Sequence, residues 1–116
     1  MTIERLENGP RMSRVVLHNN TVYLAGLTAT ATVGRSVAEQ TAEILAKIDD
    51  LLKQAGTDKS KLLEATIWLQ DIRVVDEFNK IWDSWVVPGS APVRACIAAQ
   101  LQSPAKMVEI KVTAAK

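Results

Sequence analysis

Short runs of apolar and β-branched residues open the chain, and the polar residues between them mark turns. Residues 14–17 and 21–26 are two such runs, and they flank Asn19 and Asn20. Asparagine tolerates the positive φ that a tight turn requires, so this pattern predicts a β-hairpin. Residues 2–7 are expected to add an edge strand in front of it.

Two later segments carry apolar residues at the three- and four-residue spacing of an amphipathic helix. The first follows Ser36, which has Glu39 three residues later as a capping box requires, and Gly56 is expected to end it. Its inward positions are Val37, Thr41, Ile44, Leu45, Ile48, Leu51 and Leu52. The second segment ends before Pro88 and Gly89. Its inward positions are Phe78, Ile81, Trp82, Trp85 and Val86.

Three further runs, residues 62–69, 91–99 and 106–114, have the length and composition of strands, and Asp71 after the first is a cap or turn residue. The order of elements predicts an α+β fold in which two helices pack on one face of a mixed sheet. Residues 1–116 contain no repeat, linker or low-complexity tract, so a single domain is expected. The other face of the sheet then requires a cover.

The composition narrows the classes of partner. The chain has 116 residues, 47% of them hydrophobic, and a net charge of +1 with Lys and Arg spread along it, which does not favour nucleic acid or an anionic membrane. The sequence shows neither a long apolar span nor a signal-peptide pattern, so a cytoplasmic location is expected. A chain of this size leaves apolar surface for a partner, which makes oligomerisation an expectation.

The one cysteine, Cys96, has no second cysteine with which to form an internal disulfide. Because the whole sequence contains only this cysteine and one histidine, it offers no recognisable ligand set for zinc, and no metal site is expected.

Single opposite charges stand in the last two predicted strands, Arg94 in one and Glu109 in the other. Alternation places Arg94 on the same side of its strand as Cys96 and Ala98. One interpretation is a salt bridge between Arg94 and Glu109, within or between chains. The other is that the planar guanidinium of Arg94 receives the carboxylate of a ligand, which leaves Glu109 free to orient a water.

Several motifs in this region resemble the RidA/YjgF family of reactive-intermediate deaminases. The late signature of that family matches Pro92-Val93-Arg94-Ala95-Cys96 and the run Val108-Glu109-Ile110-Lys111-Val112-Thr113-Ala114. Further similarity lies at Gly26 and at residues 38–41 and 70–72. Residues 18–21, 82–87 and 91–94 are similar to the YoaB-like branch of the family.

The resemblance implies a chorismate mutase-like fold that assembles as a homotrimer, with three equivalent clefts between subunits lined by Arg94 and Glu109. It also implies the hydrolysis of 2-imino acids, the tautomers of reactive enamines, to 2-oxo acids and ammonia without a cofactor. Arg94 then holds the substrate carboxylate, and Glu109 orients or deprotonates the attacking water. Backbone groups near Gly26 and Cys96 complete the pocket, while the Cys96 thiol is expected to be a packing group.

One departure from the family concerns a tyrosine that lines the cleft in its best-known branch. The matching residues here are Arg11-Met12-Ser13, which place Met12 where the tyrosine would stand. Met12 either lines an apolar part of the cleft or packs locally, and Arg11 or Arg14 offers a second positive charge. The segment 27–35 is short for the family, and Trp85 is the aromatic candidate for the cleft wall.

Two functional hypotheses from different classes follow. The first is a hydrolase, a 2-imino-acid deaminase that relies on Arg94 and Glu109. The second is a non-catalytic binding module that retains small 2-oxo or amino carboxylates through Arg94 and has a regulatory role. An RNA-cleaving role is disfavoured because the sequence has neither a basic patch nor a histidine in the expected cleft.

Overall fold

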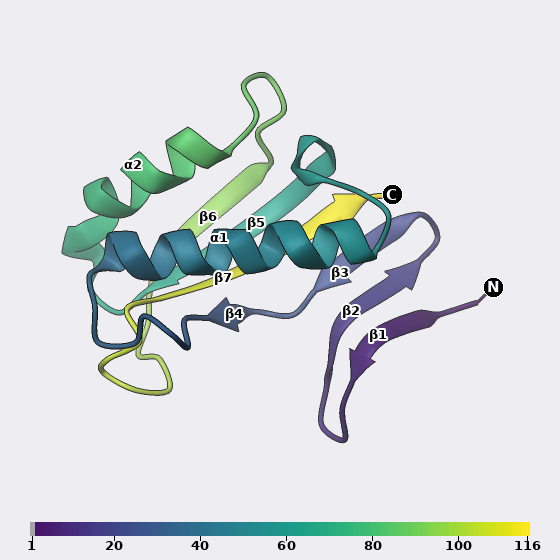
Figure 1. Cartoon of the computed structure of the whole chain (residues 1–116). Coiled ribbons are helices and arrows are strands. Elements are labelled where there is room, and N and C mark those ends of the chain that lie inside the picture. Colours follow the sequence, from purple (N-terminus) through teal and green to yellow (C-terminus); the bar gives the residue numbers. More distant parts are fainter. Residues whose placement is uncertain (1) are drawn as a thin grey trace.

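The apolar runs of the chain form one mixed sheet of seven strands, and two α-helices pack against it (Figure 1). The structure is a computed structural model that describes residues 2–116. Its elements in chain order, with η for a 3₁₀ turn, are β1 (Glu4–Asn8), β2 (Ser13–His18), β3 (Thr21–Leu24), β4 (Leu27–Thr28), α1 (Val37–Gln54), η1 (Lys59–Lys61), β5 (Leu62–Leu69), η2 (Ile72–Val74), α2 (Val75–Trp85), β6 (Val93–Ala98) and β7 (Val108–Ala115). The predicted α+β class is confirmed.

The last strand of the chain, β7, lies in the interior of the sheet. The strand order is β1-β2-β3-β7-β5-β6, and β4 also pairs with β7. All pairs are antiparallel except β5 with β6, which run parallel because α2 carries the chain back across the sheet between them. This arrangement leaves β1 and β6 as the two edge strands, as predicted for the N-terminal one.

The hairpin of β2 and β3 forms for the reason that its sequence indicates. Asn19 and Asn20 form the turn, and both adopt positive φ angles, of 52° and 62°. A two-residue turn with both φ angles positive matches the right-handed twist of the flanking strands. The register therefore places Val15 and Val22 in the core, because alternate residues of each strand face the same side.

Helix α1 begins and ends where the sequence predicted. The Ser36 hydroxyl accepts a hydrogen bond from the backbone N–H of Glu39 at 3.1 Å and caps the first turn. Gly56, at φ 84°, ends the helix in a conformation that side chains with a Cβ rarely adopt. On its buried side, Gln40 donates to the carbonyl of Ala105 and accepts from the N–H of Met107, so α1 also holds the loop that leads into β7.

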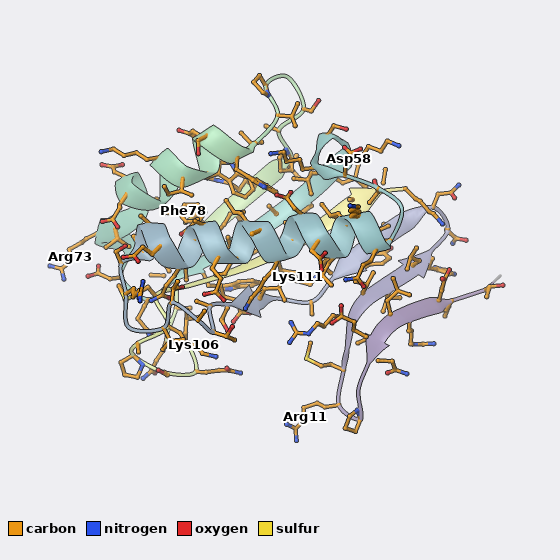
Figure 2. All side chains as sticks on the ribbon, viewed as in Figure 1. Arg11, Asp58, Arg73, Phe78, Lys106 and Lys111 are labelled. Atoms are coloured by element: carbon orange, nitrogen blue, oxygen red, sulfur yellow. The ribbon has the colours of Figure 1, made fainter. Side chains whose placement is uncertain are left out.

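Helix α2 packs its aromatic side onto the sheet. Asp71 caps the 3₁₀ turn η2, which leads directly into α2, by accepting a hydrogen bond from the N–H of Arg73 at 2.9 Å, and its predicted role as a cap is confirmed. Phe78 and Trp82 are both buried, and their ring centroids are 6.1 Å apart. Figure 2 shows Phe78 between α2 and α1, and its side chain belongs to the hydrophobic core.

Both helices cover the same face of the sheet, and the opposite face is bare (Figure 1). The covered face holds the core, including Ile67 and Ile110. On the bare face, which we call the open face, Val93 is 71% exposed and Tyr23 is 43% exposed. Within residues 2–116, neither helix combines the length and the apolar character that crossing a bilayer requires.

The segment 27–35 contains a strand that the sequence analysis did not predict. Its first two residues form β4 and pair with β7, and the carboxylate of Glu43 in α1 holds the next turn. That carboxylate accepts hydrogen bonds from the N–H groups of Thr30 and Thr32 at 2.8 and 2.9 Å and pairs with Lys47 at 2.8 Å. Partial burial raises the pKa of Glu43, but the hydrogen bonds from Lys47, Thr32 and Thr30 outweigh it and hold that pKa well below its usual range.

Glu43→Ala removes the acceptor that orders this turn. We expect it to lower the free energy of unfolding by about 2–3 kcal/mol near pH 7, because several N–H groups lose a charged partner. Since the folded state depresses the pKa of Glu43, its contribution is complete above the ordinary value of 4.5 and is lost as the pH falls below it. Urea titrations at about pH 7 and pH 3 should therefore show a smaller difference between variant and wild type at the lower pH.

Asp50→Ala is the matched control, because Asp50 is an exposed carboxylate on the same helix and accepts a hydrogen bond from the Gln54 side chain. We expect it to change the stability by less than about 0.5 kcal/mol. Equal losses for both variants, or a loss in Glu43→Ala that does not depend on pH, would contradict the anchoring role of Glu43.

Candidate functional site

The carboxylate of Glu109 lies on the open face, directly against the backbone of Gly26. β7 alternates between core and open face, so Val108 and Ile110 are buried while Glu109 points the other way. A Cβ at position 26 would overlap Oε2 of Glu109, so only glycine allows this close approach. Glu109 is half-buried and has no ion-pair partner within residues 2–116.

The neighbours of Glu109 come from the strands on both sides of β7. Thr28 in β4 and Trp68 in β5 are its cross-strand partners, so their side chains share the open face with it. Nζ of Lys106 donates to Oγ1 of Thr28 at 3.1 Å and brings a positive charge to this end of the face. Figure 2 shows Lys106 on the loop that leads into β7.

Arg94 lies on the edge strand β6, and its guanidinium rests against α2. Nη1 donates to Oδ1 of Asn79 at 2.8 Å. Its Cζ lies 5.8 Å from the ring centroid of Phe78 and 5.6 Å from that of Trp82, within the range of cation–π attraction. No carboxylate within residues 2–116 pairs with it. The cation is therefore held in place by an amide and two rings while its charge remains without a counter-ion.

Arg94 and Glu109 point to opposite faces of the sheet. Arg94 is in register with Ala65, whose side chain is buried under the helices, whereas Glu109 is in register with Trp68 on the open face. The salt bridge that the sequence left open is therefore not formed within residues 2–116. A single chain does not bring the guanidinium and the carboxylate together.

Cys96 lies on the same side of β6 as Arg94, as the alternation predicted. It is half-buried and packs against the core. Burial raises the pKa of the Cys96 thiol, and the charge of Arg94 opposes this only in part. The thiol is therefore protonated at neutral pH and poorly suited to act as a nucleophile.

Met12 lies far from both charges in the same chain. It is 51% exposed and belongs to the loop between β1 and β2. The hollow that it lines is formed by this hairpin alone, with Arg5, Pro10, Arg11 and Val16 among the lining residues. Figure 2 shows Arg11 at the tip of the hairpin, away from the body of the molecule.

Trp85 belongs to the helical layer. Its indole N–H donates to both carboxylate oxygens of Asp49 in α1 at 3.1 Å, and Nζ of Lys59 lies 5.2 Å from its ring centroid. Its ring centroid is 5.4 Å from that of Trp82, so Trp85 packs against one of the two rings that Arg94 contacts. It does not share the open face with Glu109.

The sequence analysis missed three residues of these two regions: Asn79 beside Arg94, and Trp68 and Lys106 near Glu109. For Trp68 a signal existed, because alternation in LLEATIWL places this tryptophan on the polar side of its strand with Glu64 and Thr66. Nothing comparable in the sequence pointed to Asn79 or Lys106. Within residues 2–116, no group of three or more His, Cys, Asp or Glu side chains is arranged to hold a metal ion.

Comparisons with known proteins show the family and the fold of the chain. The family model described as Endoribonuclease L-PSP matches residues 2–116. The chain is 46% identical over 115 residues to the RutC family protein YoaB of Escherichia coli strain K12, covering 99% of each chain. The crystal structure of a YjgF family protein from Neisseria meningitidis superposes with a TM-score of 0.96 at 42% identity, covering 100% of this chain and 96% of that one. A rat 2-iminobutanoate/2-iminopropanoate deaminase is 27% identical over 107 residues, covering 88% of this chain and 77% of that protein.

Gly26→Ala tests whether Gly26 makes room for the Glu109 carboxylate. We expect it to lower the free energy of unfolding by about 1 kcal/mol, because the added Cβ displaces the carboxylate. In a Glu109→Ala background the obstacle is gone, so the same substitution should cost less by about 0.5 kcal/mol or more. A double-mutant cycle measured by urea denaturation gives this coupling energy.

Gly9→Ala is the control, because a Cβ at Gly9 would lie 3.4 Å from the nearest atom, the carbonyl oxygen of Met12. Its effect should be the same with and without Glu109. Equal costs for Gly26→Ala in both backgrounds would contradict the close packing of Gly26 on Glu109.

Proposed function

Because the chain belongs to the RidA/YjgF/L-PSP family, we propose that it hydrolyses reactive 2-imino acids to 2-oxo acids and ammonia. The observation that carries this proposal is Arg94, an ordered guanidinium with no carboxylate partner within residues 2–116. A planar guanidinium binds a carboxylate through two parallel hydrogen bonds, and 2-imino acids present one beside the reacting carbon. The distant relative named as a 2-iminobutanoate/2-iminopropanoate deaminase supports the same substrate class.

Glu109 supplies the second part of the reaction. Its carboxylate accepts a proton from the attacking water as the water oxygen bonds to the carbon of the C=N group, and then gives that proton to the nitrogen, which forms a carbinolamine. Glu109 next takes the hydroxyl proton and passes it to the amine, so that the C–N bond breaks, ammonia leaves and the 2-oxo acid forms. The imine carbon is already electrophilic, so the site mainly positions the substrate and a water. The hydrolysis consumes only water and needs no redox partner or cofactor.

The site requires more than one copy of the chain. Because Arg94 and Glu109 face opposite sides of the sheet, we propose that Arg94 of one subunit meets Glu109 of another in a homotrimer. The open face supplies the reason for assembly, since Val93, Ile97 and Tyr23 leave apolar surface exposed to water. Backbone groups at Gly26 and Cys96 line the cleft, and Met12 reaches it from the projecting hairpin of a neighbouring subunit.

Arg94→Ala and Glu109→Gln test the two roles. We expect Arg94→Ala to lower kcat/KM by about 100-fold or more, because the substrate carboxylate loses its partner. Glu109→Gln should lower kcat by about 100-fold, since an amide does not take the proton of water. An amino-acid oxidase generates the imino acids, and semicarbazone formation follows the imine that escapes hydrolysis.

Arg73→Ala is the control for loss of an exposed arginine, because among the described residues Arg73 pairs only with the nearby Asp71. It should keep full activity. If the wild-type protein hydrolysed imino acids with several different side chains no faster than buffer does, the result would contradict the proposed deaminase activity. If calorimetry then detected 2-oxo acids bound through Arg94, the result would favour the binding module instead.

Mixing the two inactive variants tests the shared site. When Arg94→Ala and Glu109→Gln chains are unfolded together and reassembled, about a quarter of the sites in random trimers combine an intact Arg94 with an intact Glu109 from different copies. We expect activity to return to about that fraction of the wild-type value. Sedimentation should show trimers throughout.

Each variant reassembled alone is the control and should stay inactive. Inactive mixed trimers would show that both residues of a site belong to the same chain. A wild-type protein that remains monomeric at high concentration would contradict the shared site altogether.

A further inference from the structure

Trp68 is a large apolar residue on the side of β5 that faces away from the hydrophobic core. Ala65, Ile67 and Leu69 of this strand are buried under the helices. Alternation sends Trp68 to the open face, where it is half-buried and contributes nothing to the hydrophobic core. Its indole N–H has no acceptor within residues 2–116. A tryptophan in this setting retains much of its apolar surface for a further contact.

The strand register places Trp68 immediately beside Glu109. Trp68 is the cross-strand partner of Glu109 in β7, and on its other side it is in register with Ile97 in β6. Cβ atoms of directly opposed residues in neighbouring strands lie about 4.5–5.5 Å apart. A ligand atom held at the Glu109 carboxylate therefore has the indole within reach of its substituents.

The two sides of Glu109 differ in chemistry. On the β4 side, the cross-strand neighbour of Glu109 is Thr28, whose hydroxyl accepts a hydrogen bond from Lys106. On the β6 side, Trp68 and then Ile97 follow, and Ile97 is 46% exposed. This difference orients a substrate that has one polar and one apolar end, because its apolar side chain loses most contact with water when it lies on the Trp68 side.

We propose that Trp68 is a specificity-determining residue that selects 2-imino acids with large branched or aromatic side chains. This inference rests on the proposed function, because it takes the reacting carbon to lie at Glu109. The substrate side chain packs on the indole and on Ile97, and the carboxylate is held by Arg94 of another subunit. Small imines, such as the one derived from alanine, lack the atoms that reach Trp68.

Trp68→Ala and Trp68→Phe test the selection. We expect Trp68→Ala to lower kcat/KM for the imines of phenylalanine and leucine by about tenfold or more, and for the imine of alanine by less than about threefold. Trp68→Phe retains an aromatic wall and should recover most of the lost activity. Calorimetry with phenylpyruvate and pyruvate gives the same comparison for binding, without any turnover.

Val93→Ala is the matched control, because Val93 is a more exposed apolar residue on the same face but lies four residues away from Ile97 along β6. It should leave unchanged the ratio of kcat/KM for the imine of phenylalanine to that for the imine of alanine. Equal losses for large and small substrates in Trp68→Ala, or no loss for either, would overturn the inference. If Trp68→Ala does not form the trimer, a Trp68→Phe variant that loses more activity on the imine of alanine than on the imine of phenylalanine would overturn it.

The readouts separate this inference from the proposed function. Turnover by the wild type with an unchanged substrate ratio in Trp68→Ala would overturn the role of Trp68 alone. Absence of turnover together with a Trp68-dependent preference for phenylpyruvate over pyruvate would overturn the deaminase alone. Failure of the wild type to turn over imines or to bind either 2-oxo acid would overturn both.

Discussion

The alternation of side chains along β7 is the constraint on which the fold and the site both depend. Because this strand lies between β4 and β5, its inward residues Val108, Ile110 and Val112 are all fully or almost fully buried. The same alternation fixes Glu109 on the other face, where Gly26 leaves room for its carboxylate. A slip of one residue would drive Glu109 into the core and expose Val108 and Val112, so core packing protects the placement of the Glu109 carboxylate.

The two charged residues that attracted attention in the sequence are positioned by different means. Glu109 is placed by a central strand, whereas Arg94 lies on an edge strand and depends on α2 for its orientation. Phe78 and Trp82 therefore serve two roles, since they fill the core and also support a cation that has no counter-ion within residues 2–116. A monomer exposes this guanidinium and the apolar open face together. The proposed association of copies would remove this apolar surface from water and would bring charged groups of different chains near one another.

Polar side chains of α1 and of the turn after β5 organise the loops around Glu109. Gln40 and Gln70 hold both ends of the loop that carries Lys106, and Glu43 fixes the turn after β4. These contacts join residues that are far apart in sequence, and all but the one from Thr30 to Glu43 are partly buried, so an unmade hydrogen bond there would be costly. The surroundings of the site are therefore held by side chains that do not touch it.

Local patterns in the sequence determined the helices and most strands. Ser36 and Gly56 bound α1, Asn19 and Asn20 make the turn between β2 and β3, and alternation placed Arg94 and Cys96 on one side of β6. The sequence by itself did not determine which side of β6 meets the helices, because this strand has no clear division into apolar and polar sides. Nor did it predict β4, the contact of Asn79 with Arg94, or the position of Trp68 beside Glu109. Those features depend on strand order and register, which are decided by packing between distant segments of the chain, whereas caps and periodicity act among near neighbours.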